Sequence, residues 1–341
     1  SLVGSEMCIR DRFYYCFSCG AGGNSLKFLM ELKRQSFSDV VMELARRYSL
    51  PVETLDANQQ ERLRQQLSRR DQLHRVLSLA SGWFRSRLQA PEGAAALEYL
   101  RQQRGLSAGT IESFELGYAP EAWDGLLRHL QQVEGIDPSL MEAAGLVVPR
   151  KGGNGFYDRF RHRLMVPIHD RQGRIIGFGG RSLDGSEPKY LNSPETEVFD
   201  KGKNLYGFDK AADAIRRADC ALVVEGYFDV IALHAAGVRH AVAALGTAMS
   251  AQQITQLCRC SESRRIILNF DADGAGVRAA QRTIGEVELQ ALQGQLELRV
   301  LHLPAGKDPD EFLKQYSQAD YLALQDKAPL WLCLLYTSPS P

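Results

Sequence analysis

Residues 221–245 read ALVVEGYFDVIALHAAGVRHAVAAL, which is an apolar run, a helical stretch and a second apolar run. The same alternation continues to residue 303. It predicts strands at 221–225, 240–245, 265–270 and 297–303, with helices at 227–236, 250–258 and 276–292. Strands separated by helices in this way pair in parallel within one sheet. The pattern therefore predicts an α/β fold with a mostly parallel four-stranded sheet flanked by helices.

Carboxylates follow these apolar runs, each close to a turn rich in Gly or Pro: Glu225, Asp271, Asp273, Asp308 and Asp310. The carboxyl ends of the strands in an open α/β sheet form the crevice in which ligands bind. Carboxylates gathered there repel one another unless cations lie between them, and hard divalent cations prefer carboxylate oxygens. The placement predicts a Mg²⁺ or Mn²⁺ site. The alternative for any one of these residues alone is the capping of a helix N-terminus.

The bulk composition is that of an ordinary globular protein, with 341 residues, 44% hydrophobic residues and a net charge of zero. No overall field therefore draws the chain to nucleic acid, and such binding needs a local basic patch. Residues 150–189 are a candidate for such a patch, because nine Lys or Arg residues stand there against four acids. The alternative is a solvated face. No run approaches the ~20 apolar residues of a membrane span. The N-terminus lacks a signal-peptide pattern, and the seven scattered cysteines indicate a reducing cytoplasm.

Glu225-Gly226 after a predicted strand, followed later by Asp271-Ala272-Asp273, resembles the Toprim signature that DnaG-type primases, topoisomerases and certain nucleases share. Further stretches narrow the resemblance to the polymerase core of bacterial DnaG-type primases. They are YDRFRHRLMVPIHDRQGRIIGFGGRSL (157–183), PKYLNSPETEVFDKGKNLYGF (188–208), VVEGYFDVIALHAAG (223–237) and ALGTAMS (244–250). The resemblance runs from about residue 13 to residue 330.

The resemblance implies the synthesis of short RNA primers from ribonucleoside triphosphates on a single-stranded DNA template during replication. It implies that Glu225 is a general base or a metal-organising acid, that Asp271 and Asp273 are catalytic, and that all five carboxylates serve as metal ligands. It also implies a replicative helicase as partner, bound through a C-terminal domain expected well beyond residue 341, and a cytoplasmic, nucleoid-associated location. The alternatives are another Toprim enzyme, a topoisomerase or nuclease, and an inactive module that binds single-stranded DNA.

Four basic residues are candidates for holding nucleotide or template phosphates. The resemblance places Arg181 and Lys189 beside the metal crevice and suggests Arg104 as a third groove residue. Arg159, Arg161 and Arg163 alternate in the sequence, so an extended strand would place all three on one face. Of these three, Arg161 is the candidate for binding nucleotide or template phosphates. Phosphate contacts of this kind position nucleic acid without reading its sequence. The alternative for each arginine is a surface salt bridge.

Cys16-Phe17-Ser18-Cys19 has the C-x₂-C spacing of one zinc knuckle. A tetrahedral structural zinc needs two further ligands, and the resemblance implies that an upstream Cys-x₂-His knuckle supplies them. Upstream of Phe13 this chain has only Cys8 and no histidine. The site at Cys16 and Cys19 is therefore an incomplete half, so zinc is expected in the parent protein and not in this fragment unless Cys8 or another chain completes it.

These observations together predict a chain truncated at both ends. The predicted order is a foreign terminus (1–12), the remnant of a zinc ribbon (13–50), a linker or helical spacer (51–71), a mixed α/β subdomain (72–218), a Toprim subdomain (219–310), the start of a helical subdomain (311–331) and a second foreign terminus (332–341). Within the α/β subdomain, residues 163–183 predict a β-hairpin that turns at residues 171–173.

Overall fold

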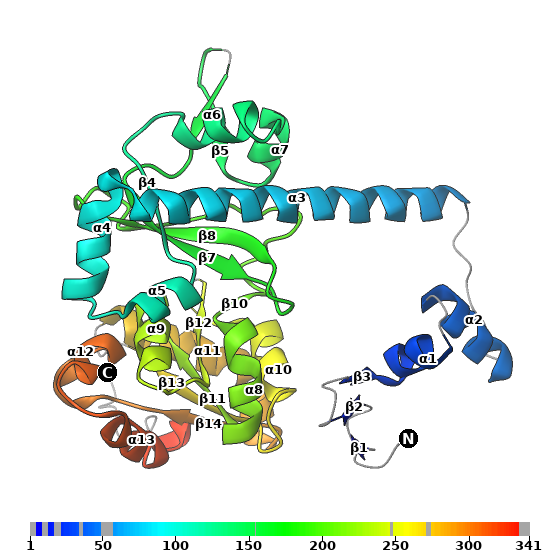
Figure 1. Ribbon diagram of the computed structural model, residues 1–341. Coiled ribbons are helices and arrows are strands. Elements are labelled where there is room, and N and C mark those ends of the chain that lie inside the picture. The colour runs from blue at the N-terminus through cyan, green and yellow to red at the C-terminus, as the bar shows by residue number, and fades with distance from the viewer. Residues whose placement is uncertain are drawn as a thin grey trace. The chain divides into compact units, whose positions relative to one another are not determined.

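Figure 1 shows the computed structural model of the chain, which describes residues 5–8, 13–16, 22–33, 37–48, 57–153, 155–245, 248–270 and 274–333. The chain divides into two compact units, residues 1–66 and residues 67–341. The first unit holds an antiparallel sheet of order β1-β2-β3 followed by two helices. Their bounds are β1 (Ser5–Cys8), β2 (Phe13–Cys16), β3 (Gly22–Asn24), α1 (Ser25–Lys33) and α2 (Phe37–Arg47).

The second unit contains an antiparallel sheet of order β4-β7-β8-β9. Its strands are β4 (Gly117–Ala119), β7 (Arg163–His169), β8 (Ile175–Ser182) and β9 (Tyr190–Asn192). β7 and β8 form the predicted hairpin, which turns at Gly173 with a φ of 78°. The C-terminal part of the long helix α3 (Ala57–Gln89) lies along this sheet (Figure 1). Its Phe84 packs against Phe178, with ring centroids 5.3 Å apart. Residues 57–71, assigned to the linker or spacer, are thus the first part of a helix.

Short elements connect α3 to this sheet and extend beyond it. They are a 3₁₀ turn η1 (Pro91–Gly93), α4 (Ala94–Glu98), a π-helical turn η2 (Tyr99–Gln103), α5 (Ala108–Ser113), α6 (Gly125–Gln132), α7 (Pro138–Ala143) and the two-stranded sheet of β5 (Val147–Pro149) and β6 (Phe156–Asp158). Buried Asp158 accepts hydrogen bonds from the backbone N–H groups of Leu126 and Leu127, and so it holds the first turn of α6 against β6.

A second sheet has the order β10-β12-β11-β13-β14. Its strands are β10 (Leu205–Tyr206), β11 (Cys220–Val224), β12 (Ala241–Ala244), β13 (Arg265–Asn269) and β14 (Glu297–Val300). The last four pair in parallel, which confirms the predicted fold class and its four strands. β10 adds an antiparallel edge beside β12 that the sequence did not predict, because two residues carry no recognisable period.

Helices cover both faces of this sheet (Figure 1). They are α8 (Phe208–Ala218), α9 (Tyr227–Ala235), α10 (Ala251–Cys258), α11 (Gly274–Leu292), the 3₁₀ turn η3 (Pro304–Gly306), α12 (Pro309–Leu313) and α13 (Gln318–Asp326). Successive side chains of β11 point to opposite faces. Leu222 and Val224 join the core that contains α9, α12 and α13, whereas Ala221 and Val223 join the core of α8, α10 and α11.

The strand order places a topological switch point between β11 and β13. From β11 the chain moves to β12 on one side, and β13 returns to the other side of β11 before β14 continues outward. Connections on the two sides of such a point leave a crevice at the carboxyl ends of the strands, where α/β proteins bind their ligands. The segments that follow β11 and β13 therefore border the expected binding edge.

The glycines of β8 allow the two sheets to approach each other closely. A Cβ atom at Gly179 would lie 2.6 Å from the ring of Tyr227, the first residue of α9. At Gly180 a Cβ atom would lie 2.9 Å from the ring of Phe160. The GFGG stretch of residues 177–180 therefore serves close packing within a strand.

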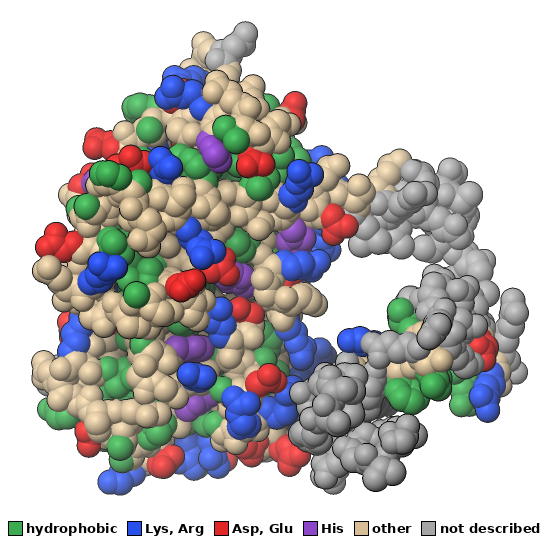
Figure 2. Space-filling view, viewed as in Figure 1, with side chains coloured by type: hydrophobic (Ala, Val, Ile, Leu, Met, Phe, Trp, Pro, Cys, Tyr) green, Lys and Arg blue, Asp and Glu red, His purple; other side chains and the backbone are tan. Residues whose placement is uncertain are grey.

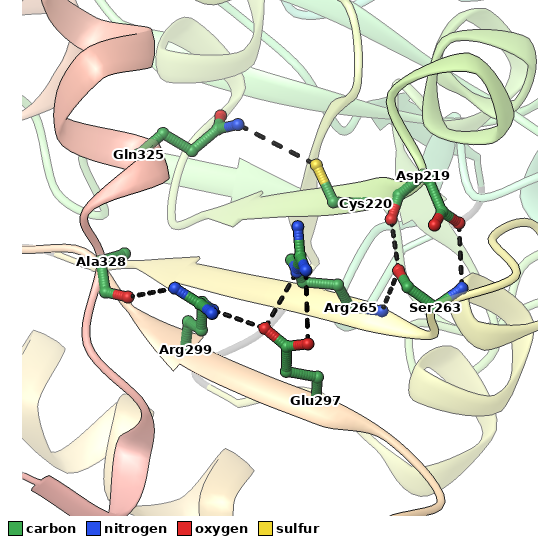
Figure 3. Close-up of polar contacts among 8 residues, drawn as sticks. All are labelled: Asp219, Cys220, Ser263, Arg265, Glu297, Arg299, Gln325 and Ala328. Atoms are coloured by element: carbon green, nitrogen blue, oxygen red, sulfur yellow. Dashed lines mark hydrogen bonds and ion pairs between the residues drawn. The ribbon is translucent and has the colours of Figure 1, made fainter.

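At the opposite, amino edge of the parallel sheet, Glu297 joins two arginines (Figure 3). Its carboxylate accepts from Nε of Arg265 at 2.9 Å and from Nε of Arg299 at 2.5 Å. Arg299 also donates to the carbonyl oxygen of Ala328, just beyond α13, at 2.9 Å. Burial works to raise the pKa of Glu297, but the two guanidiniums hold that pKa below its usual range. Glu297 thus links β13 to β14, and Arg299 links β14 to the segment that follows α13.

Replacing Glu297 with Gln is expected to lower the free energy of unfolding by about 1–2 kcal/mol at neutral pH, because two guanidiniums lose a shared carboxylate. A carboxyl group with a lowered pKa stabilises the fold above its unfolded-state pKa, and this contribution disappears as the pH falls through the folded-state pKa. Urea unfolding of both proteins at neutral and acidic pH measures the effect. The difference between them should shrink in acid, and a constant difference would contradict the assignment.

Candidate functional site

The carboxyl edge of the parallel sheet presents Glu225 at the switch point. β11 and β13 pair with Val224 opposite Asn269, so Glu225 and Phe270 occupy the first positions beyond the two strands. Glu225 is half-buried. Asp271 and Asp273 follow Phe270 in the chain but lie outside the described residues. The described backbone thus bears out the strand-end position predicted for Glu225.

Hydrogen bonds of two side chains, Asp229 and Asn269, fix the ends of these strands. Asp229 accepts from the backbone N–H of Gly226 at 3.0 Å, which secures the turn between Glu225 and α9. Asn269, the last residue of β13, donates to the carbonyl oxygen of Leu301 at 3.2 Å and accepts from the hydroxyl of Tyr321 at 2.6 Å. Because both side chains of this second pair are buried, their hydrogen bonds lock the strand end from which the chain departs toward Asp271.

Asp308 and Asp310 lie at the start of α12, which packs against α9. Asp308 is the N-cap of α12 and accepts from the backbone N–H of Glu311 at 2.7 Å. This is the capping role that was the alternative for a lone carboxylate. Asp310 is only 3% exposed and forms ion pairs with Arg104 and Lys314. Both carboxylates therefore hold protein groups, and their assignment as metal ligands remains a prediction.

Arg104 and Arg181 come together around two aromatic rings. The Arg104 guanidinium carbon lies 4.5 Å from the Phe228 ring centroid and 5.6 Å from that of Tyr99. The corresponding distances for Arg181 are 5.7 Å and 5.1 Å. Arg181 also donates to the hydroxyl of Tyr190 at 2.6 Å. We call these five residues the arginine cluster. The structure thus joins Arg104, the residue that follows η2, to Arg181, from β8, although 76 residues separate them in the sequence.

The electrostatic balance of the arginine cluster favours the binding of an anion. Burial works to lower the pKa of Arg104, but the hydrogen bond to Tyr99 and the charge of Asp310 raise that pKa above its ordinary value. Arginine side chains stay charged in proteins, whereas Asp310 is the one carboxylate among the described residues that is paired with either guanidinium. Lys314 shares Asp310. The three cations against one carboxylate leave a local positive charge that suits phosphate.

Lys189 lies at the rim, next to the cluster residue Tyr190. Its backbone carbonyl accepts from the N–H of Ser182 at 2.9 Å, and its backbone N–H donates to Glu187 at 3.1 Å. The side chain is exposed, and within the described part of the chain its ammonium forms no hydrogen bond or ion pair. The backbone hydrogen bonds of Lys189, and not a contact of its side chain, therefore place it beside the arginine cluster.

Arg159, Arg161 and Arg163 do not share one strand, so that expectation is wrong. β6 ends at Asp158 and β7 begins at Arg163, and between them His162 has a left-handed φ of 49°. Arg163 points inward, where it donates to the backbone carbonyls of Gly180 and Pro188. Arg159 donates to the carbonyl of Asn192 at 3.1 Å. Arg159 and Arg161 are both half-buried, and the assignment of Arg161 to nucleic-acid binding stays a prediction.

Arg161 lies between two aromatic rings on the surface. Its guanidinium carbon is 4.4 Å from the Trp123 ring centroid and 5.1 Å from that of Tyr157. Trp123 is 62% exposed, which is unusual for so large an apolar side chain. An exposed aromatic ring beside an arginine suits a base that stacks and a phosphate that pairs. Sequence reasoning missed Trp123 and Tyr157, and only their spacing to the basic run could have drawn attention to them.

The donor set at the carboxyl edge fits a hard divalent cation, because its titratable side chains are carboxylates and none is a thiol. Among the described residues no group of three or more His, Cys, Asp or Glu side chains converges as a metal site. Two of the five predicted ligands, Asp271 and Asp273, lie outside those residues. Of the zinc half-site, Cys19 also lies outside them, and the backbone of Cys16 ends β2.

Three family descriptions match consecutive parts of the chain. A CHC2 zinc finger matches residues 6–60, the N-terminal domain of the DNA primase catalytic core matches residues 83–212, and a Toprim-like domain matches residues 222–313. A DNA primase domain from Pseudomonas aeruginosa has a similar structure, with a TM-score of 0.70 and 43% identity over 76% of this chain and 79% of that one. The chain belongs to the DnaG-type DNA primase family.

Two further relatives support this membership. The DNA primase of Synechococcus elongatus is 61% identical over 94% of this chain and 46% of its own length. A DnaG primase catalytic domain solved bound to single-stranded DNA is 37% identical, with a TM-score of 0.69, over 77% of this chain and 81% of that one. The chain spans about half the length of the curated relatives it matches. No helix in the described ranges is both long and apolar enough to span a membrane.

Proposed function

We propose that this chain carries the polymerase activity of a primase, namely synthesis of short RNA from ribonucleoside triphosphates on single-stranded DNA with Mg²⁺ or Mn²⁺. The observation that carries the proposal is the position of Glu225 at the switch point of a Toprim-type sheet, together with an arginine cluster tied to the same edge through Asp310 and α12. A relative solved with single-stranded DNA supports the template as a partner.

Carboxylates and basic side chains have separate roles in the proposed reaction. Glu225, Asp271, Asp273, Asp308 and Asp310 would hold the divalent ions. When bound, those ions would lower the pKa of the attacking 3′-hydroxyl and neutralise the negative charge that develops on the phosphate oxygens. Arg104 and Arg181 bind the triphosphate through paired guanidiniums, and Lys189 at the rim adds a further positive charge.

The template is held at a separate surface. Trp123 and Tyr157 stack on bases, and Arg161 pairs with the backbone phosphate between them. Such contacts are independent of sequence, because every base offers a π-face and every nucleotide a phosphate. In Figure 2 acidic and basic side chains are interspersed over the visible face of the second unit, in keeping with zero net charge. Binding of the template therefore depends on this local surface and not on an overall field.

The family resemblance extends the proposal in three directions. Zinc would be bound at the ribbon segment to which Cys16 and Cys19 belong, provided that two more ligands are supplied. A replicative helicase would engage the family's C-terminal domain. The compartment would be the cytoplasm, at the replication fork. Each of these three is inferred from the family and from no contact within the described residues.

The proposal is tested by incubating the protein with single-stranded DNA, labelled ribonucleotides and either Mg²⁺ or Mn²⁺. We expect short RNA products that require both the template and the metal, and that disappear in Asp271→Ala. Equal product from Asp271→Ala and wild type would refute the mechanism. Nicking or relaxation of a supercoiled plasmid in place of RNA synthesis would favour the nuclease or topoisomerase alternative. Template binding without any chemistry would favour an inactive binding module.

A further inference from the structure

Tyr99 contacts both arginines of the arginine cluster. Its hydroxyl accepts a hydrogen bond from Nε of Arg104 at 2.8 Å, and its ring centroid lies 5.6 Å from the Arg104 guanidinium carbon and 5.1 Å from that of Arg181. Phe228 meets the same ring edge to face, with centroids 6.5 Å apart. The two rings therefore form a shared support on which both guanidiniums lie.

Two guanidiniums held on the same rings repel each other, and a partly buried setting strengthens that repulsion. Asp310 offsets the charge of Arg104 but forms no ion pair with Arg181 in the described part of the chain. Arg181 has the hydroxyl of Tyr190 as a hydrogen-bond partner, while its buried Nε has none among the described residues. The negative faces of the Tyr99 and Phe228 rings provide the remaining attraction for both cations.

We propose that Tyr99, supported by Phe228, is a positioning residue that fixes the spacing of Arg104 and Arg181 for a polyphosphate chain. This inference rests on the proposed function, because it assigns the cluster to the triphosphate of the incoming nucleotide. Without the shared ring, the two guanidiniums move apart to reduce their repulsion. A ligand that contacts both guanidiniums at once then binds more weakly. The affinity for a single phosphate stays the same whether the guanidiniums are close together or apart.

The unsatisfied Nε of Arg181 supports this assignment. A buried donor without a partner is costly, and a native protein tolerates one where a ligand completes it. Tyr99 and Phe228 keep Arg181 in that position when no phosphate is present. The rings therefore prepare the site before the nucleotide arrives, which reduces the ordering that binding requires.

The experiment measures binding of Mg²⁺-ATP, of inorganic phosphate and of a single-stranded DNA oligonucleotide to wild type, Tyr99→Phe, Tyr99→Leu and Phe228→Leu. Tyr118→Phe is the matched control, since it also removes a tyrosine hydroxyl that bonds to a basic side chain, the ring of His162, at 2.8 Å. Binding is measured without polymerisation, and melting temperatures identify any variant that is unfolded.

We expect Tyr99→Leu to raise the Kd for Mg²⁺-ATP about tenfold or more, and Tyr99→Phe to raise it only about threefold because the ring remains. Phe228→Leu should fall between them. The affinities of these variants for inorganic phosphate and for DNA, and the affinity of Tyr118→Phe for Mg²⁺-ATP, should stay within about twofold of wild type. In primer-synthesis assays the same variants should raise the KM for ribonucleotides more than they lower kcat.

Three outcomes would overturn the inference. Wild-type affinity for Mg²⁺-ATP in a folded Tyr99→Leu protein would show that the ring does not position the arginines. Weaker binding of DNA with unchanged binding of Mg²⁺-ATP would assign the cluster to the template. Equal losses for phosphate and for Mg²⁺-ATP would show that spacing is not what the ring provides. If wild type binds Mg²⁺-ATP as expected but makes no RNA, the proposed function fails while this inference is still decided by the binding data.

Discussion

Replacing Glu225 with Gln is expected to lower the rate of RNA synthesis by about 10³-fold, in the range found when a group acting in proton transfer is removed. The substitution keeps the size of the side chain and removes its charge. Glu225 follows β11 at the switch point and is half-buried, so its charge lies where the triphosphate and the metal ions would gather.

The control for Glu225→Gln is Glu262→Gln. Glu262 is an exposed glutamate of the same subdomain that precedes β13, at the opposite edge of the sheet. Incorporation of labelled ribonucleotide, measured at saturating metal and template, should be unchanged in this variant. Single-stranded DNA binding should be retained in both variants. Activity of Glu225→Gln within about tenfold of wild type would remove Glu225 from the catalytic set.

Replacing Asp310 with Ala is expected to lower the free energy of unfolding by about 3 kcal/mol, the cost typical of breaking a buried ion pair. The Asp310 side chain is 4% exposed and that of Arg104 is 16% exposed. Removal of the carboxylate leaves the Arg104 guanidinium and the Lys314 ammonium near each other without their shared partner. The effect should be large because Arg104 cannot reach water without leaving the aromatic rings of the cluster.

Asp308→Ala provides the matched comparison, since it removes a carboxylate two residues away on the same helix. Its expected cost is about 1 kcal/mol, the usual value for the loss of an N-cap. Denaturant unfolding of both variants, and of Arg104→Met with and without Asp310→Ala, gives the coupling energy between the pair. Equal costs for the two aspartates, or a coupling energy near zero, would show that the ion pair does not hold α12 against the arginine cluster.

Much of the fold was predictable because the hydrophobic pattern of each strand and helix matched its burial in the structure. The strands at 221–225, 240–245 and 265–270 are buried on both faces, so each is a short apolar run bounded by turns, which the sequence displays directly. The edge strand at 297–303 instead alternates charged and buried apolar residues at its start. The hairpin of β7 and β8 was equally clear from its turn. The same logic located Glu225, because the end of an apolar run is the end of a strand.

The arginine cluster was only partly predictable, because it depends on contacts between distant segments. Resemblance to the family pointed to Arg104 and Arg181, but the rings between them come from η2 and α9, and no period in the sequence relates Tyr99 to Phe228. Asp310 was predicted as a metal ligand with no sign of its guanidinium partner 206 residues away. Pairings of this kind are set by tertiary packing.

The failed prediction for Arg159, Arg161 and Arg163 has a local cause. Alternation implies one face only if the backbone stays extended, and His162 adopts a left-handed conformation between the second and third arginines. That turn sends Arg163 into the interior and leaves Arg161 against Trp123. A left-handed non-glycine residue is stabilised by its surroundings, here by the hydrogen bond between His162 and Tyr118, so it left no signal in the sequence.

The central claim is that the carboxyl edge of the parallel sheet binds the divalent ions. It is tested most directly by replacing Mg²⁺ with Fe²⁺ and mapping where hydroxyl radicals formed at the bound iron cut the backbone. We predict cuts beside Glu225, at residues 270–274 and near Asp308, all suppressed by excess Mg²⁺ and lost in Asp271→Ala. Cuts confined to other segments, or cuts at these sites that Mg²⁺ does not suppress, would contradict the account.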